Sequence, residues 1–345
     1  MEKLHLFAGG NTSRGFHSCF EDILPAKERR RMFYIKGGPG VGKSTMMGRV
    51  AGAAEEMGQR VEYFHCSSDP DSLDGIALPD LGWAMMDGTA PHVYDPVIPG
   101  ARDTLVSLGD FLDEEAMRPK AKEISALQQE ISLRFHRCYG FLSAAGELGR
   151  LCASAQMREE ALHRLARDWT ADLPKRGGLG SCRRLFASAF TPKGLMDVLP
   201  REGLSMARVE CPACTTLTPL WQEISWTACW RGLPVVHLVN PLWPDQLDGV
   251  LLPEQGILLC TCLPGSCPQA VEWGRIAVDE KSSEQEQSYD RNAYELMLQR
   301  AVEQLGCAKN LHDELESHYI GHMDFLAWQG KLDAVLGELK AAAGC

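Results

Sequence analysis

The residues with the clearest chemical meaning form one short run near the start of the chain. Residues 37–45 read Gly-Gly-Pro-Gly-Val-Gly-Lys-Ser-Thr and fit the pattern G-x-x-x-x-G-K-[ST] in full, between an apolar segment and a predicted helix. Glycines let successive main-chain N–H groups turn inward around phosphate oxygens, and the helix N-terminus adds partial positive charge. We expect Lys43 to contact the β- and γ-phosphates of a nucleotide and the Ser44 hydroxyl to bind Mg²⁺. The predicted nucleotide-binding residues are Gly37, Gly38, Pro39, Gly40, Val41, Gly42, Lys43, Ser44 and Thr45.

An aspartate at the end of a predicted strand completes the expected magnesium site. Asp87 closes the apolar run 83–86, at the place where a P-loop protein has the acid that orients a magnesium-bound water. An ordinary strand-end aspartate is the alternative explanation. No glutamate occurs in residues 88–92, whereas many motor-type ATPases carry a catalytic glutamate directly beside this aspartate. The sequence therefore favours slow hydrolysis, switching or transfer to a bound acceptor over fast mechanical hydrolysis.

The chain repeats itself. Residues 70–75 return as 244–249, a shift of 174, and residues 6–15 return in weaker form as 185–194. We interpret the chain as two homologous halves, residues 1–175 and 180–345, that pack as an intramolecular pseudo-dimer. Arg14 and Lys193 precede equivalent glycines, and each could be a solvated turn cation or a finger that reaches the phosphate site of the other half.

Three aspartates lie in the loop after the predicted strand 60–65. Loops at the carboxyl ends of parallel strands share one edge of a sheet, so we expect these acids near the phosphates. They could orient a water or accept a proton, although Asp, Ser and Pro also form turns. Asp71 and Asp74 recur in the second half, which indicates a structural role. Asp69 is therefore the predicted catalytic residue of this loop, beside Lys43 and Asp87.

The second half has lost the phosphate motif. At the shift of 174, Leu217 stands in the place of Lys43 and Thr261 in the place of Asp87, which predicts a pseudo-domain without tight triphosphate binding. Its cysteines could converge at the vacated site and bind zinc or an iron–sulfur cluster, or form a redox pair. Simple drift of a disused site is the alternative. The candidate thiols are Cys211, Cys214, Cys260 and Cys262, with Cys267 close behind.

The elements that must position these residues alternate between strands and helices. The apolar run 32–35 and the predicted strand 60–65 enclose a predicted helix at about 44–57, which indicates an α/β fold with mainly parallel sheets. A helix is also expected to begin near Gly15. Each half then ends in a long stretch with apolar residues at 3,4 spacing, which predicts a helical hairpin or coiled-coil-like arm. Such arms either pack on the sheet or bind a protein partner.

Four blocks of sequence resemble a little-characterised bacterial family of tandem P-loop proteins, whose members are described as ATPases or ATP-binding proteins. The blocks are residues 6–16, 37–45, 66–75 and 87–92, and the resemblance extends into the second half at 186–194. It implies two P-loop NTPase-like domains and ATP binding at Gly42, Lys43, Ser44 and Thr45. Family members typically carry an intact phosphate loop in both halves, and this chain does not.

Composition narrows the location and the partners. The 345-residue chain has a formal net charge of −11, which argues against general binding to nucleic acid or anionic lipid. No apolar run reaches the length of a membrane span, and the first residues do not resemble a signal-peptide core. Thirteen cysteines without an export signal indicate reduced thiols, so a cytoplasmic protein is expected.

These observations predict Mg-dependent ATP binding and slow ATP hydrolysis by the first half. A small-molecule kinase, in which the loop after residue 65 helps to form an acceptor pocket, is the first alternative. A nucleotide-sensing scaffold that binds a partner through its helical arms is the second. Adenine is favoured over guanine because the chain lacks the Asn/Thr-Lys-x-Asp pattern that reads guanine in small GTPases.

Overall fold

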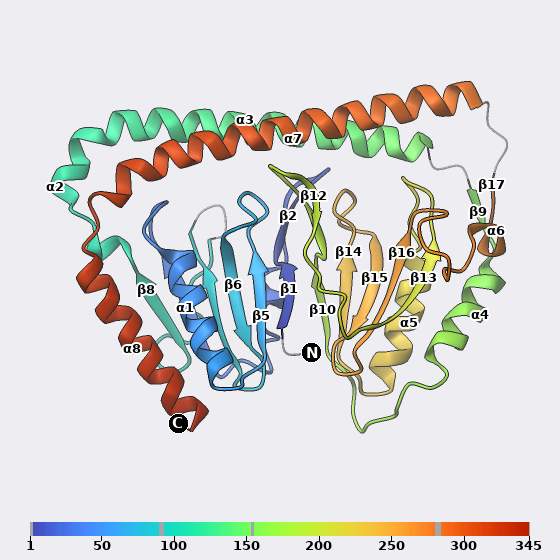
Figure 1. The fold of residues 1–345 in the computed structure, drawn as a ribbon, viewed down its shortest axis with the longest axis horizontal. Helices are drawn as coiled ribbons and strands as arrows, with labels where there is room; N and C mark the ends of the chain where they lie inside the picture. The colour runs from blue at the N-terminus through green and yellow to red at the C-terminus, as the bar shows by residue number, and fades with distance from the viewer. Residues whose placement is uncertain (1–2, 90–92, 153–154, 280–283, 345) are drawn as a thin grey trace.

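The computed structural model of the chain describes residues 3–89, 93–152, 155–279 and 284–344. Two separate sheets stand side by side beneath a pair of long helices (Figure 1). The expected α/β class is confirmed, because helices cover both sheets and in each sheet one strand alone runs against the others. Among the described residues, no helix has both the length and the apolar character that a bilayer span requires.

The first sheet has six strands, of which only β6 runs against its neighbours. The strand β4, which lies between β7 and β8, has a continuous apolar run at 32–35 that is buried, as is typical of parallel sheets. Two helices, α1 (Lys43–Glu56) and α8 (Phe325–Ala343), share an apolar core with this sheet, and together they form the first unit. In sheet order the strands are β1 (Lys3–Phe7), β5 (Val61–His65), β6 (Leu73–Leu78), β7 (Trp83–Asp87), β4 (Arg31–Lys36) and β8 (Asp103–Ser107).

The second sheet repeats this arrangement with five strands. The bounds of β14 and β15 lie 174 residues after those of β5 and β6 at both ends, and both pairs are antiparallel. Here α5 (Thr218–Trp230) and α4 (Glu159–Thr170) complete the apolar core, and together with the sheet they form the second unit. In sheet order the strands are β10 (Cys182–Leu185), β14 (Val235–Val239), β15 (Leu247–Leu252), β16 (Ile257–Cys262) and β13 (Ser205–Glu210).

A third sheet of two hairpins joins the units. β2 pairs with β11 where Asn11 lies opposite Phe190, and the Asn11 amide donates to the Phe190 carbonyl at 3.0 Å. The prediction of a helix near Gly15 is wrong, because Gly15 has φ +91° and closes a hairpin turn in which Thr12 Oγ1 donates to its carbonyl at 2.8 Å. The strands of this sheet, in order, are β12 (Gly194–Asp197), β11 (Ser188–Thr191), β2 (Gly9–Thr12) and β3 (Gly15–Ser18).

The helical arms exchange between the halves. α3 (Ala121–Cys152) runs from the first unit toward the second and leads to α4, whereas α7 (Glu284–Ile320) runs back beside it and leads to α8 (Figure 1). The prediction of a separate helical hairpin after each domain is wrong, because the apolar stripe of each long helix packs against the other half. Their shared core contains Cys138, Leu142, Ala145, Ala301 and Leu305.

Short elements complete the chain. A two-stranded sheet lies next to the second unit, and brief helical turns occupy the connections. These elements are η1 (Phe20–Asp22), η2 (Gly109–Phe111), α2 (Glu114–Met117), η3 (Arg118–Lys120), α6 (Trp273–Ile276) and the paired strands β9 (Ala155–Met157) and β17 (Ala277–Asp279).

A buried ion pair crosses the contact between the two units. The Arg183 guanidinium donates to the two carboxylate oxygens of Glu62 at 3.1 and 2.7 Å, and also to the main-chain carbonyls of Asp22 and Ile23. The side chains of Arg183 and Glu62 are only 9% and 5% exposed. Both charges are therefore removed from water. The free-energy cost of this desolvation is offset by the attraction between the two charges, so it is offset only when both are present.

We predict that Arg183→Met lowers the free energy of unfolding by about 3–5 kcal/mol, because it leaves the Glu62 carboxylate buried without its partner. Urea unfolding followed by circular dichroism measures this loss. The double variant Arg183→Met with Glu62→Leu should recover most of it. A double variant as unstable as the single one would contradict the assignment of this pair.

Candidate phosphate-binding site

The predicted phosphate motif lies between β4 and α1, at the carboxyl edge of the first sheet. Residues 37–42 form a loop in which Gly40 has φ +70° and Gly42 has φ +85°, a region that favours glycine. Gly42 is also the N-cap residue of α1, so the first N–H groups of this 14-residue helix face the loop. The arrangement combines a turned glycine backbone with a helix N-terminus, as anion sites in proteins do.

Lys43 and Asp87 lie together at this edge. The Lys43 ammonium donates to the carbonyl oxygens of Gly37 and Gly38 at 3.0 and 2.8 Å, and lies 3.6 Å from a carboxylate oxygen of Asp87. Both side chains are only about 15% exposed. The strands that carry them are neighbours, with Ile35 of β4 opposite Asp87 of β7. The structure therefore brings together two residues that are 44 positions apart in the sequence.

The remaining motif residues take different positions. Ser44 Oγ accepts the main-chain N–H of Leu73 at 2.9 Å, which connects the start of α1 to the start of β6. Val41 is fully buried in the core of the first unit, while Pro39 is half-buried and Thr45 is exposed. The Val41 side chain thus anchors the loop in the core, and only its main chain faces the candidate site.

Asp74 is a further acidic residue next to the predicted site. Its side chain is buried beside Asp87 and Lys43, and it is hydrogen-bonded to the Cys66 thiol. Burial, and next the negative charge of Asp87, raise the pKa of Asp74 to about 7. Recurrence in the second half suggested only a structural role. The apolar run Ile76–Leu78 within the same strand was the available signal, because a carboxyl at the start of a buried strand is itself buried.

The other aspartates of this loop contact side chains from the second half. Asp69 accepts a hydrogen bond from Ser72 Oγ at 2.9 Å and lies 3.5 Å from the ammonium of Lys309 on α7. Lys193 forms an ion pair with Asp71 at 2.6 Å. Lys193 therefore reaches the loop after β5, where its described partner is a carboxylate.

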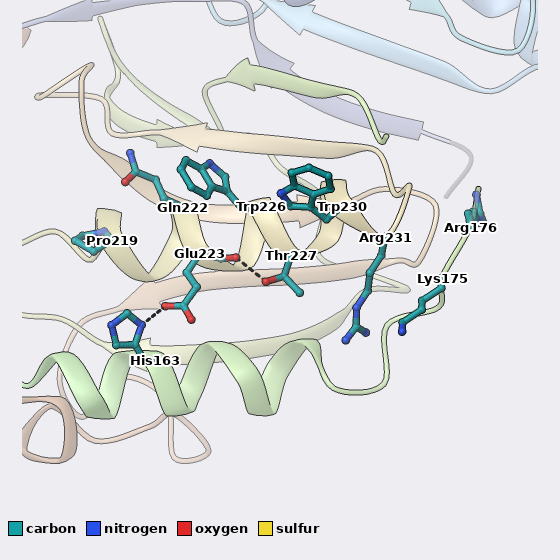
Figure 2. A pocket seen from close by; sticks show the side chains of 10 residues that line it. All are labelled: His163, Lys175, Arg176, Pro219, Gln222, Glu223, Trp226, Thr227, Trp230 and Arg231. Atoms are coloured by element: carbon teal, nitrogen blue, oxygen red, sulfur yellow. Dashed lines mark hydrogen bonds and ion pairs between the residues drawn. The ribbon is translucent and has the colours of Figure 1, made fainter. Parts of the chain in front are cut away.

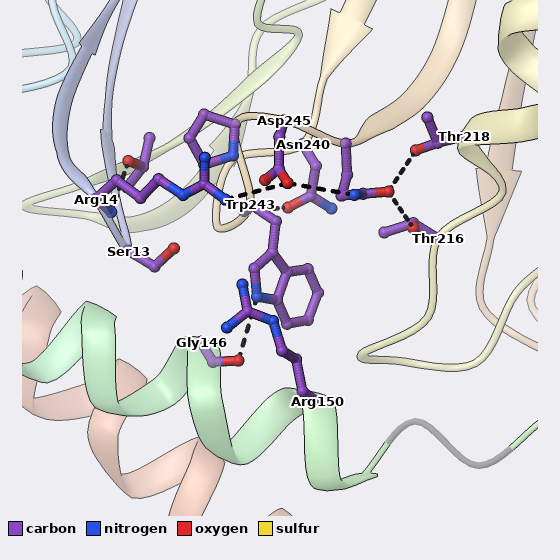
Figure 3. Close-up of polar contacts among 12 residues, drawn as sticks. Ser13, Arg14, Gly146, Arg150, Thr216, Thr218, Asn240, Trp243 and Asp245 are labelled. Atoms are coloured by element: carbon purple, nitrogen blue, oxygen red, sulfur yellow. Dashed lines mark hydrogen bonds and ion pairs between the residues drawn. The ribbon is translucent and has the colours of Figure 1, made fainter.

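The equivalent contact on the other side completes a pseudo-twofold arrangement. Arg14 of the first half pairs with Asp245 of the second at 3.1 Å, which mirrors the contact of Lys193 with Asp71 (Figure 3). Close by, the Trp243 indole, which replaces Asp69, donates to the Gly146 carbonyl of α3 at 3.2 Å. Each unit thus receives one turn cation from the other.

The ends of α7 and α8 cover the loop 37–42. A Cβ added to Gly38 would lie 2.9 Å from the Tyr319 ring, and one added to Gly42 would lie 3.0 Å from the Trp328 indole nitrogen. At Gly40 the neighbours of such an atom are side-chain and main-chain atoms of α7. The loop is therefore packed between the first sheet and the arm that comes from the second half.

The second unit keeps the shape of this site without its charge. Cys214 has φ +69°, matching Gly40, and Thr218 Oγ1 accepts the N–H of Leu247 at 2.8 Å, as Ser44 accepts that of Leu73. Leu217, in the place of Lys43, is fully buried in the core. A cavity of about 450 Å³ lies here, and its lining includes Cys211, Cys214, Asn240, Asp248 and Thr261.

The four candidate thiols of this cavity do not form a compact ligand set. Within the described residues, no three of Cys211, Cys214, Cys260 and Cys262 place their sulfur atoms within 4.8 Å of one another. Burial raises the pKa of the Cys211 and Cys214 thiols to about 12 in each case, which disfavours the thiolate that a metal needs. The geometry thus gives no support to zinc or an iron–sulfur cluster at these positions.

A larger hollow on the second unit holds none of the predicted phosphate ligands. It has a volume of about 840 Å³ and lies along α5, where Trp226 and Trp230 are 68% and 78% exposed (Figure 2). His163 of α4 and Glu223 of α5 are hydrogen-bonded at 2.5 Å beside it. Its lining shares no residue with the predicted site.

Comparison with known proteins assigns no family to the chain. No protein-family model, no curated protein and no solved structure matched it. The interpretation of the site therefore depends on its own residues and geometry.

The raised pKa of Asp74 predicts a pH-dependent stability. The folded-state pKa of about 7 lies above the usual value of 3.8, so protonation of Asp74 stabilises the fold below about pH 4, and this contribution is lost as pH rises to 7. Asp74→Asn cannot ionise. It should therefore gain stability relative to wild type between pH 5 and pH 8, on the order of a few kcal/mol.

Urea unfolding of both proteins at several pH values measures this difference. Asp71→Asn is the control, because Asp71 lies three residues away and is exposed, and its ion pair with Lys193 holds the pKa of its carboxyl below the usual value. This control should show no such gain. A difference between Asp74→Asn and wild type that stays constant with pH would contradict the prediction.

Proposed function

We propose that the first unit binds a magnesium–nucleoside triphosphate complex through residues 37–45, with ATP as the favoured nucleotide, and hydrolyses it slowly. The observation that best supports this proposal is the loop 37–42, where Gly40 and Gly42 turn the backbone at the start of a long helix. Main-chain N–H groups of this kind, with a lysine beside them, are a common protein site for polyphosphate. Since Leu217 replaces the lysine in the second unit, we propose one nucleotide site per chain.

The residues beside the loop suit Mg²⁺. The Ser44 hydroxyl and the Asp87 carboxylate flank Lys43 with hard oxygen atoms, the ligand type that this ion prefers. When bound, Mg²⁺ would neutralise charge that develops on the phosphate oxygens. Lys43 would exchange the carbonyl oxygens of Gly37 and Gly38 for phosphate oxygens and stabilise the transferred phosphoryl group.

Two carboxyl groups are candidates for orienting the attacking water. Asp69 remains one, held by Ser72 and close to Lys309. Asp74 is the second, because it is buried next to Asp87 and its pKa of about 7 suits a group that accepts a proton at neutral pH. Since no glutamate follows Asp87 in the sequence, hydrolysis is expected to be slow.

Lys43→Ala should raise the dissociation constant for Mg–ATP at least tenfold, because the ammonium that would contact the phosphates is removed. Isothermal titration calorimetry measures this change. Lys27→Ala is a matched control, because Lys27 is an exposed lysine that precedes β4 and lies outside the loop. Equal affinity of the Lys43→Ala and wild-type proteins would overturn the proposed site. Phosphate release without an added acceptor supports hydrolysis, whereas ATP consumption only with an added metabolite indicates a kinase.

The packing of the arm on the loop favours nucleotide sensing as a second function. Gly38 and Gly42 contact Tyr319 and Trp328, so a change in the loop backbone on phosphate binding must displace the end of α7 or α8. The equivalent helix on the other side, α4, packs on α5 of the second unit, where the lysine is absent. A nucleotide would therefore act on one arm and leave the other unchanged.

Mg–ATP should change the amide hydrogen exchange of residues 313–330 by at least threefold in rate, because these residues cover the loop. Mass spectrometry of exchanged peptides measures this change, and α4 (Glu159–Thr170) is the internal control. Lys43→Ala should abolish the effect. If Mg–ATP binds and residues 313–330 exchange as before, the arm is not coupled to the site.

A further inference from the structure

Two cysteines of the second unit lie against each other at the end of the sheet opposite the phosphate loops. Cys182 is the exposed first residue of β10, and Cys229 lies in the last turn of α5. The Cys182 and Cys229 side chains are close enough to interact with each other. Cys229 Sγ also lies 3.9 Å from the Ser181 carbonyl oxygen, and Cys182 Sγ lies 3.6 Å from both ring nitrogens of His237.

The first unit shows that side chains at these positions bond to each other. Lys3 pairs with Val61 in the sheet register as Cys182 pairs with Val235, so Lys3 and Cys182 occupy equivalent positions. There the Lys3 ammonium forms an ion pair with Glu55 at 2.8 Å. Glu55 is the counterpart of Cys229 at the shift of 174. The second unit has thus replaced both members of a strand–helix ion pair by cysteine.

A third residue of this contact also differs between the two units. In the first unit the Tyr63 hydroxyl donates to Glu55 at 2.7 Å, and Tyr63 is the counterpart of His237. Drift at a single position would put one thiol beside an unrelated residue. Here a strand residue and a helix residue that touch in both units are both cysteines, and an imidazole lies beside one of them. This pattern suits a bond between the two sulfur atoms.

We propose that Cys182 and Cys229 are a reversible dithiol–disulfide site whose oxidant is a low-molecular-weight disulfide of the glutathione class. The exposed Cys182 sulfur attacks the reagent, forms a mixed disulfide and releases one reagent thiol. The Cys229 sulfur then displaces the second reagent thiol and forms the Sγ–Sγ bond. Two protein S–H bonds and one reagent S–S bond break, both protons leave on the reagent thiols, and the protein pair loses two electrons.

The bond would connect β10 to the end of α5 and so fix the position of the strand that makes the contact with the first unit. The residue after Cys182 is Arg183, whose guanidinium pairs with Glu62. Oxidation would therefore stiffen the second unit next to the interface between the units. This inference goes beyond the proposed nucleotide function and does not depend on it.

The test uses the full-length reduced protein and oxidised glutathione. After incubation, free thiols are blocked by alkylation, and a digest made without reductant is analysed by mass spectrometry. We expect a cross-linked peptide pair that contains Cys182 and Cys229, at least a tenfold loss of alkylation at both, and full reversal by dithiothreitol. Cys307→Ser is the matched control, because Cys307 is an exposed thiol on α7, and it should leave the cross-link unchanged.

Cys229→Ser should leave Cys182 as a glutathione adduct, and circular dichroism checks that this variant is folded. Three results would overturn the proposal. The two cysteines could remain as open to alkylation after oxidation as before it. Both could carry glutathione without a cross-link. Cross-links could also form to the same extent between cysteines that lie apart in the structure.

Discussion

The proposed function depends on the backbone conformation of the loop 37–42. This conformation requires a positive φ at two positions. Gly40 and Gly42 adopt this conformation without a side-chain penalty, and each is covered from outside by the arm of the second half. A side chain at either position would be strained, and it would also meet α7 or the Trp328 indole. Glycine is therefore required here by conformation and by packing.

In the second unit, the position equivalent to Gly40 is occupied by a residue other than glycine. Cys214 has a positive φ, as Gly40 has, although it carries a side chain. The loop of the second unit therefore keeps this backbone conformation without a glycine. Leu217 lies at the position equivalent to Lys43, and its side chain is part of the apolar core. The hydroxyl of Thr218 still accepts the N–H of Leu247, because that bond fixes the helix to the sheet. The features that persist are structural, and the features that are lost are those that would contact phosphate.

The two units form one structure because each completes the other. Lys193 and Arg14 cross to the loops of the opposite unit, and α7 brings Lys309 next to Asp69. The exchanged arms place α8 on the first unit and α4 on the second. The second half therefore has a structural role in the first unit, because it supplies the helix that covers the loop 37–42.

Much of this organisation could be predicted from the sequence, and the exceptions have a common cause. The motif at 37–45 and the strand that ends at Asp87 placed Lys43 and Asp87 together correctly, because parallel strands share an edge. The helical periodicity showed an apolar stripe but did not identify its partner, so the exchange of arms was missed. The hairpin at Gly15 was missed because its turn is closed by a threonine hydroxyl and a positive φ. Asp74 was assigned a structural role because its recurrence as Asp248 was given more weight than the apolar run 76–78 that follows it in the same strand.

The number of nucleotides bound per chain decides whether the first unit holds a single nucleotide site. Native mass spectrometry of the intact protein with magnesium and a non-hydrolysable ATP analogue gives this number, and we expect one nucleotide on each chain at saturation. Two nucleotides per chain would show that the second unit has kept its site. No bound nucleotide at millimolar analogue would contradict the proposal that the loop beneath α7 and α8 holds a polyphosphate.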